Sequence, residues 1–133
     1  MGDTTYDLGK AELEVLKVLW DHGPAAVREV RRHLHEAGRK LAYTTVQTFL
    51  TRLEQKGYVT SDKTGFAYVF RAKLTRERVT RSRLKNLVQQ LYDGAAGQLV
   101  LQLVRTERFT KEERHELQKL IDMFDAKNEG PKP

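Results

Sequence analysis

The chain has 133 residues, no cysteine and a net charge of +6, from 24 Lys and Arg against 18 Asp and Glu. The absence of cysteine excludes a disulfide scaffold, a cysteine nucleophile, an iron–sulfur cluster and a cysteine-based zinc finger. The longest apolar run, at residues 99–101, is far too short to cross a bilayer, and the acidic N-terminus lacks the apolar segment of a signal peptide. We therefore expect a soluble, cytoplasmic protein of one or two small units.

The positive charge is concentrated in the middle of the chain. Residues 39–85 contain 12 Lys and Arg against three acids, a net charge of +9, whereas the other residues contain 12 against 15 and carry −3. A basic segment between near-neutral flanks is typical of a protein that binds a polyanion. A solvated basic face that keeps the chain soluble is the alternative. A membrane surface fits less well, because no basic helix in the sequence also has a strongly aromatic apolar face.

Three short amphipathic helices are predicted first, at residues 10–21, 25–37 and 43–56. Each has apolar side chains at the spacing of one buried helix face. Glycines that follow the apolar stripes indicate where the second and third helices end, at Gly38 and Gly57. The residues assigned to the outward face of the first helix are Glu12, Glu14 and Lys17.

The periodicity changes to that of β-strands after the third helix. Residues 58–62 form one predicted strand, residues 63–65 a turn, and residues 66–70 a return strand rich in aromatic and β-branched side chains. A two-stranded hairpin is only marginally stable by itself in water. We therefore expect the hairpin to pack against the three helices in a first unit of residues 1–73.

Three further helices are predicted in a second unit of residues 74–127, followed by a disordered tail at residues 128–133. Thr75 is expected to cap the first of these helices. The last helix opens with a capping box, in which Thr110 precedes Glu113 by three residues. These local signals indicate that the second unit is entirely helical.

The second unit is too small to bury the apolar stripes of three helices by itself, one of them a short apolar helix at residues 95–104. We expect these stripes to meet their copies in a symmetric dimer. The alternative is that the helices fold back on the first unit. The residues predicted to form the dimer interface are Leu84, Leu87, Leu91, Leu99, Leu103, Leu117, Leu120, Ile121 and Phe124.

Three helices followed by a hairpin is the element order of a winged helix-turn-helix. In this fold the third helix enters the DNA major groove, and the hairpin, or wing, reaches the backbone or the minor groove. The outward face of the predicted third helix, which has Ala42 or Thr44 at its N-cap, offers hydroxyls, amides and an arginine but no acid. An ordinary solvated face mixes Glu and Lys at i,i+4 spacing. This composition therefore favours contact with DNA.

The residues predicted to contact DNA come from this helix face and from the hairpin. Gln47 and Arg52 are long enough to reach base edges or phosphates, and the threonine methyls suit the methyl groups of thymine. Lys63 at the turn is expected to contact a phosphate, whereas Lys56 at the helix end meets a phosphate or only solvent. The full set is Tyr43, Thr44, Thr45, Gln47, Thr48, Arg52, Lys63 and Tyr68.

A basic run follows the hairpin, at residues 76–85. Its Lys and Arg residues span more than one helical face, so only some of them can point at DNA. The sequence leaves two interpretations open for this run, a contact with the DNA backbone and a solvated connecting helix.

The sequence contains no catalytic or metal-binding constellation. It has no Gly-rich phosphate loop, nucleophile elbow or His-Glu-x-x-His motif. His33 and His35 lie two residues apart on a helix and face different directions, and His22 and His115 stand alone. We therefore expect no enzyme activity, no cofactor and no metal.

Three stretches of the chain, residues 11–20 (AELEVLKVLW), 42–53 (AYTTVQTFLTRL) and 91–94 (LYDG), carry a likeness to a known family. They resemble, in order and spacing, the opening helix, the recognition helix and the dimerisation domain of the penicillinase-repressor family of winged-helix regulators, the BlaI/MecI/CopY type. The resemblance extends over roughly residues 7–125. Ala42 and Tyr43 stand where the recognition helix of this family often opens with Ser-Pro.

The resemblance implies a homodimeric repressor that binds a palindromic operator, with double-stranded DNA and a second copy as its partners. In penicillinase-type members a membrane sensor protease triggers cleavage of the repressor at an Asn-Phe pair in the short apolar helix. The corresponding pair here is Gln102 and Leu103, which argues against induction by that route. Copper-responsive members bind metal through C-terminal cysteines, which this chain lacks.

The sequence thus predicts a mainly α protein with a small β-hairpin, in which a winged helix-turn-helix precedes a three-helix dimerisation region. The predicted function is that of a homodimeric transcriptional repressor whose third helix and wing bind the operator. The alternative is a winged-helix module that binds another protein and has no sequence-specific DNA binding.

Overall fold

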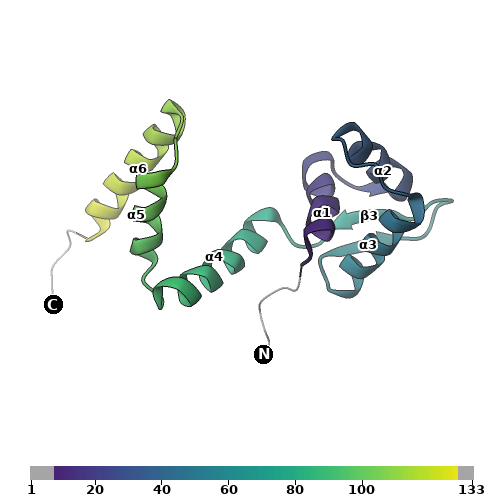
Figure 1. Cartoon of the computed structure of the whole chain (residues 1–133), viewed down its shortest axis with the longest axis horizontal. Helices are drawn as coiled ribbons and strands as arrows, with labels where there is room; N and C mark the ends of the chain where they lie inside the picture. The colour runs from purple at the N-terminus through teal and green to yellow at the C-terminus, as the bar shows by residue number, and fades with distance from the viewer. Residues whose placement is uncertain (1–7, 129–133) are drawn as a thin grey trace. The chain divides into compact units, whose positions relative to one another are not determined.

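A computed structural model describes residues 8–128 of the chain. The predicted order of three helices, a hairpin and three further helices is confirmed. The chain divides into two compact units between Leu87 and Val88. The elements are α1 (Lys10–His22), β1 (Ala25–Ala26), α2 (Val27–Glu36), α3 (Tyr43–Gln55), β2 (Val59–Asp62), β3 (Val69–Ala72), α4 (Arg76–Tyr92), α5 (Ala96–Thr106) and α6 (Lys111–Asn128) (Figure 1).

The hairpin is part of a three-stranded antiparallel sheet with the strand order β1-β3-β2. Ala25 of β1 pairs with Phe70 of β3. The sequence prediction that Ala25 and Ala26 open the second helix is therefore wrong, because the helix begins only at Val27. The N–H of Ala26 donates a hydrogen bond to the Glu29 carboxylate at 2.9 Å, which closes the start of α2 and leaves the two alanines extended.

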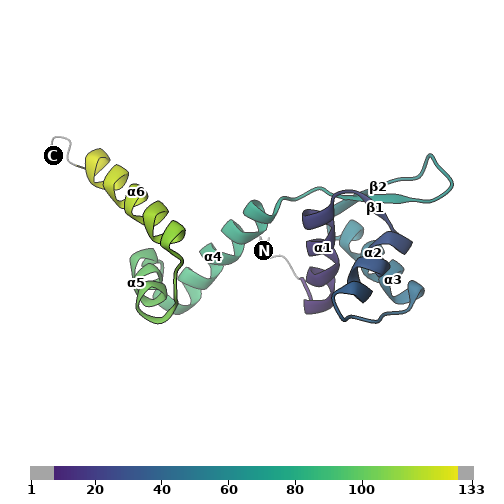
Figure 2. The ribbon, with the colours of Figure 1, turned by 90° about the horizontal axis from the view of Figure 1, so that it is seen from above.

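The wing tip, residues 63–68, connects β2 to β3. Because Asp62 pairs with Val69, the return strand starts at Val69 rather than at residue 66 as predicted. The Asp62 carboxylate accepts hydrogen bonds from the backbone N–H of Thr64 at 3.0 Å and from its hydroxyl at 2.7 Å. These bonds turn the chain away from the strand. Figure 2 shows the hairpin projecting beyond α2 and α3.

The core of the first unit lies between α1, α2, α3 and the sheet. Val46, Leu50 and Leu53 of α3 are completely buried and recur at the spacing of one helix face. Burying side chains of this size contributes about 1.5–3 kcal/mol each. The other buried core residues include Val15, Leu16, Val30, Leu34, Tyr58, Val59, Phe70 and Val79.

The start of α4 is anchored to α1. The indole N–H of Trp20 donates a hydrogen bond to the Leu74 carbonyl at 2.9 Å. The Arg76 guanidinium donates to the Asp21 carboxylate at 2.6 Å and lies 5.2 Å from the centre of the Trp20 ring. Together with buried Val79, these contacts make the first turns of α4 part of the winged-helix unit.

Two predicted helix caps are confirmed. The Thr75 hydroxyl accepts a hydrogen bond from the Arg78 N–H at 3.1 Å. At the start of α6, the Thr110 N–H donates to the Glu113 carboxylate at 2.9 Å, and the Glu113 N–H donates to the Thr110 hydroxyl at 3.0 Å. Because α6 continues to residue 128, the first residue of the predicted tail is helical. The rest of that tail, residues 129–133, lies outside the described residues.

The helices of the second unit carry apolar side chains on exposed surfaces. No side chain described from residue 88 to residue 126 is buried. Leu103 is 44% exposed and Leu120 is 60% exposed, whereas Leu99 and Leu117 are half-buried. These helices are nevertheless not membrane spans, since no helix within residues 8–128 is long and apolar enough to cross a bilayer.

Candidate nucleic-acid interface

Helix α3 presents one face to the core and the opposite face to solvent. The Ala42 carbonyl accepts hydrogen bonds from the N–H groups of Thr45 and Val46, each at 3.1 Å. Ala42, rather than Thr44, therefore occupies the N-cap position that the sequence left open, and no side chain caps the helix. Because Val46 and Leu50 are completely buried, the side chains on the other side of the helix face outward.

The outward face of α3 holds most of the residues predicted to contact DNA. Thr45 is half-buried, and the exposed members of the set on this helix are Tyr43, Thr44, Gln47, Thr48 and Arg52. The Thr48 hydroxyl donates a hydrogen bond to the Thr44 carbonyl at 2.9 Å. Its proton is therefore engaged within the helix, but its oxygen can still accept a hydrogen bond from a partner. Among the described residues, neither Gln47 nor Arg52 has a side-chain hydrogen bond, although the charge of Arg52 helps to lower the pKa of Glu12.

A groove of about 740 Å³ lies between the start of α2, α3 and the wing tip. A shallower hollow of about 350 Å³ follows the outward face of α3 and includes Thr48 and Arg52. Both are bordered by Gln47 and Thr51, so the polar face of α3 and the wing tip form one continuous surface. The groove residues from α3 and the wing tip are Tyr43, Gln47, Thr51, Glu54, Lys63, Phe66, Ala67 and Tyr68.

The single acid of α3, Glu54, lines this groove but is engaged by the wing. Its carboxylate accepts a hydrogen bond from the Ser61 hydroxyl at 2.7 Å, which joins the last turn of α3 to β2. Gly57, at a φ of 87°, makes the turn between these elements in a conformation that other residues rarely adopt. The acid therefore stabilises the position of the wing.

The wing tip combines a basic and an aromatic character. The Lys63 ammonium lies 5.3 Å from the centre of the Tyr68 ring, within the range of a cation–π interaction. Phe66 is fully exposed and also lines the groove. The sequence predicted Phe66 as a strand residue and not as a contact. An aromatic residue beside the turn glycine Gly65 is the signal that identifies it.

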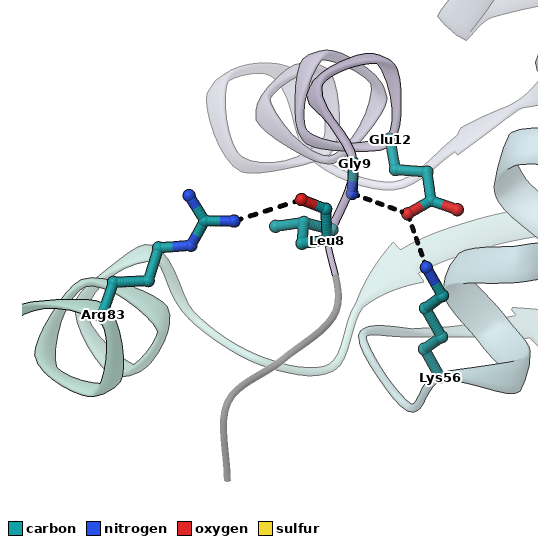
Figure 3. Close-up of polar contacts among 5 residues, drawn as sticks. All are labelled: Leu8, Gly9, Glu12, Lys56 and Arg83. Carbon is teal, nitrogen blue, oxygen red and sulfur yellow. Dashed lines mark hydrogen bonds and ion pairs between the residues drawn. The ribbon is translucent and has the colours of Figure 1, made fainter. Parts of the chain in front are cut away.

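Lys56 is paired with Glu12 of α1, a partner that the sequence prediction of a phosphate or only solvent did not include (Figure 3). The Lys56 ammonium donates to Oε1 of Glu12 at 2.7 Å, and the same oxygen accepts the Gly9 N–H at 3.0 Å. The Glu12 side chain is only 7% exposed. Its predicted place on the outward face of the first helix is therefore wrong, because the end of α3 packs close enough for Lys56 to pair with it.

The Glu12 carboxylate stays ionised in spite of its burial. Burial raises its pKa, but the hydrogen bonds from Lys56 and Gly9 and the surrounding positive charge outweigh this effect and lower the pKa below its ordinary value of 4.5. The Arg83 guanidinium donates to the Leu8 carbonyl at 3.2 Å beside this pair (Figure 3). The ends of α1, α3 and the middle of α4 are thus joined by polar contacts.

The basic run of α4 divides into two faces. Arg76 and Arg83 are engaged, since they bind the Asp21 carboxylate and the Leu8 carbonyl. A second set recurs at i, i+3 and i+7, the spacing of one helix face, and is exposed. This exposed set consists of Arg78, Arg81 and Lys85. Only this second face retains basic groups for a partner.

Two histidines that are remote in the sequence meet in the structure. The rings of His22 and His33 stack with 3.7 Å between their centres and 12° between their planes. The sequence prediction that His22 stands alone is therefore wrong, because the end of α1 packs on α2. Within residues 8–128, no group of three or more His, Cys, Asp or Glu is placed to hold a metal ion.

The sequence matches the family model of the penicillinase repressor over residues 8–123. The chain belongs to the penicillinase repressor family. It is similar to the methicillin resistance regulatory protein MecI of Mammaliicoccus sciuri, with 25% identity over 122 residues, which cover 92% of this chain and 98% of that protein. It is 27% identical to the penicillinase repressor of Bacillus licheniformis over 115 residues, which cover 86% of this chain and 89% of that protein.

Solved structures are similar to this member of the penicillinase repressor family. The solution structure of the DNA-binding domain of the repressor BlaI is 31% identical, covers 56% of this chain and 89% of that domain, and has a TM-score of 0.49. The structure of the hsRosR-S1 complex is 17% identical, covers 96% of this chain and 100% of that chain, and has a TM-score of 0.51. By its family the chain is a DNA-binding transcriptional repressor and not an enzyme.

We predict that Glu12→Gln lowers the free energy of unfolding by about 1–3 kcal/mol at pH 7, because it removes the charge from a buried, doubly hydrogen-bonded carboxylate. The folded pKa of Glu12 lies below its ordinary value of 4.5. Its stabilising contribution is therefore complete above that pH and is lost as the pH falls through the folded pKa. Urea unfolding at a series of pH values measures this loss. The free energies of unfolding of the variant and of the unchanged chain should become equal as the pH falls below the folded pKa of Glu12.

Glu14→Gln is the matched control for this prediction. Glu14 lies on the same helix and pairs with Arg39 at 3.1 Å, but both side chains are more exposed than that of Glu12. Removing an exposed ion pair costs less than about 1 kcal/mol. Equal losses of unfolding free energy in the two variants would contradict a stabilising role for the ionised Glu12 carboxylate. A difference between Glu12→Gln and the unchanged chain that persists in acid would also contradict it.

Proposed function

We propose that this repressor is a homodimer that binds a palindromic operator, with α3 of each monomer in a major groove and the wing beside it. The observation that carries this proposal is the continuous surface of α3 and the wing tip, on which the single acid of α3 is bonded to Ser61. A surface of amides, hydroxyls and basic groups suits a polyanion with hydrogen-bonding base edges. We place DNA binding in residues 1–73 and dimerisation in residues 74–127, with the first turns of α4 packed on the winged-helix unit.

Each group on the surface has a distinct role in this proposal. Gln47 and Arg52 have unused donors and the length to reach base edges. Lys63 contacts a phosphate across the groove, with Tyr68 beside it. The remaining predicted contacts, which support these from the same helix, are Tyr43, Thr44, Thr45 and Thr48. Operator binding places the repressor with the DNA, in the cytoplasm.

The exposed apolar faces of the helical region support the homodimer. Leu91 and Phe124 are 65% and 66% exposed, and a solvent-exposed apolar face of several such residues is typical of a protein–protein interface. A second copy offers the same face, which a symmetric interface requires. We therefore assign the interface to the predicted set, Leu84, Leu87, Leu91, Leu99, Leu103, Leu117, Leu120, Ile121 and Phe124.

We infer that a membrane sensor protease system, which would act by cleavage at an Asn-Phe pair, is disfavoured as a partner of this repressor. The pair that corresponds by the resemblance, Gln102 and Leu103, lies within α5 and has neither an asparagine nor a phenylalanine. A protein–protein module is the remaining alternative function, and the scarcity of free acids and apolar groups on the α3 face disfavours it.

A mobility-shift assay tests the DNA-binding proposal. Duplexes enriched from a random library by the full chain should bind far more tightly than unselected duplexes. Their affinity should fall steeply with salt, because Lys and Arg contacts with phosphates release counterions. Failure to enrich any duplex, or binding indifferent to both salt and sequence, would favour the protein–protein module.

Gln47→Ala should weaken binding to the enriched duplex by about 1–3 kcal/mol, the cost of a lost base contact, and should leave binding to unselected duplexes unchanged. Gln90→Ala is the control, because it removes an exposed glutamine from α4 outside the proposed surface. Titrations of both variants against both duplexes measure the difference. An equal loss on both duplexes for Gln47→Ala would mean that the amide contacts only the DNA backbone.

Leu120→Asp should convert the dimer to monomers, because it places a charge in the proposed interface. Ala126→Asp adds the same charge to α6, about half a turn away from the stripe that contains Leu120, and should leave the dimer intact. Light scattering of the full chain gives the mass of each variant. A dimer that persists in Leu120→Asp, or monomers from Ala126→Asp, would refute this placement of the interface.

A further inference from the structure

The exposed aromatic ring of Phe66 is the largest feature of the wing that the proposed contacts leave unused. Its side chain is 112% exposed, more than a fully solvated reference residue. The fold therefore covers almost none of this ring. A phenylalanine offers neither donor nor acceptor, so neither the fold nor a hydrogen bond to a base edge explains its position.

The shape of the wing tip holds this ring at a projecting point. The tip spans residues 63–68, between the last residue of β2 and the first residue of β3. Two hydrogen bonds from Thr64 to Asp62 fix its first turn. The hairpin projects beyond the helices in both views (Figures 1 and 2). The ring is therefore carried on a constrained turn and not on a free chain end.

The surroundings of Phe66 identify the chemistry of its partner. Phe66 lines the same groove as Gln47 of α3 and Lys63 of the tip. The tip itself carries a lysine, and Arg71 follows on the return strand. An apolar ring on the same groove as a basic group, on the surface assigned to DNA, suits a partner with a charged backbone and an apolar interior. The sugars and base edges of a DNA minor groove have this combination, and minor-groove proteins use Phe as an apolar wedge.

We propose that Phe66 enters the minor groove beside the major groove that α3 occupies, where its ring packs against deoxyribose and the edges of the bases. This inference rests on the proposed function. In it, Lys63 contacts the phosphates at the rim and Phe66 supplies apolar contact inside the groove. The wing then contributes to affinity through two separable interactions, one dependent on salt and the other independent of it.

Phe66→Ala and Lys63→Ala distinguish these two interactions on a duplex enriched by the full chain. Phe66→Ala should weaken binding about tenfold or more at every salt concentration, because a buried phenylalanine is lost. The slope of log affinity against log salt should not change. Lys63→Ala should reduce that slope by about one. Phe66→Leu is the matched control, since it keeps an apolar side chain and should retain most of the affinity.

Replacement of guanine by inosine tests the groove directly. Inosine removes the amino group of guanine from the minor groove and leaves the major-groove edge unchanged. Such replacements in the base pairs flanking the α3 contact should alter the affinity of the unchanged chain and should have no effect on Phe66→Ala. The thermal unfolding temperature of Phe66→Ala should equal that of the unchanged chain, because the ring is fully exposed.

The possible failures separate this inference from the proposed function. Failure to enrich any duplex would overturn both. If the unchanged chain binds an enriched duplex and Phe66→Ala binds it equally well, only the minor-groove contact is overturned. A changed salt slope in Phe66→Ala, an equal response of both proteins to inosine, or a lowered unfolding temperature would also overturn it.

Discussion

Burial of one face of α3 is the constraint on which the first unit depends. Val46, Leu50 and Leu53 have no exposed surface, and together they determine the rotation of the helix about its axis. With that rotation set, the side chains of Gln47 and Arg52 can only face outward. The core and the candidate DNA surface are therefore opposite sides of one helix, and a change that loosens the apolar side also displaces the polar one.

Polar contacts at the end of α3 define its position more closely than apolar packing alone. Apolar contact is not directional, so it determines burial better than it determines exact position. Lys56 bonds to Glu12 at 2.7 Å and Ser61 bonds to Glu54 at 2.7 Å, and both contacts involve the last turns of the helix. Two charged groups near the candidate surface thereby serve the structure. The basic groups that remain for DNA on this side are fewer than the net charge suggests.

The helical region presents the opposite situation. Its apolar residues recur at helical spacing as those of α3 do, yet none described from residue 88 to residue 126 is buried. Three helices of this size do not enclose a core of their own. The proposed dimer resolves this imbalance, because a second copy supplies the apolar surface that a single chain lacks. The stability of this helical region would then be coupled to dimerisation and would rise with protein concentration.

The sequence by itself determined the type and order of the helices and the outward face of α3. These features follow from signals that act over a few residues, such as the helical spacing of apolar residues and the caps at Thr75 and Thr110. Only the tertiary structure decided that β1 joins the sheet, that Lys56 pairs with Glu12 and that Phe66 lies in the wing tip. Each of these depends on strand register or on groups far apart in the chain, 44 residues in the case of Lys56 and Glu12, and local patterns carry no information about such distances.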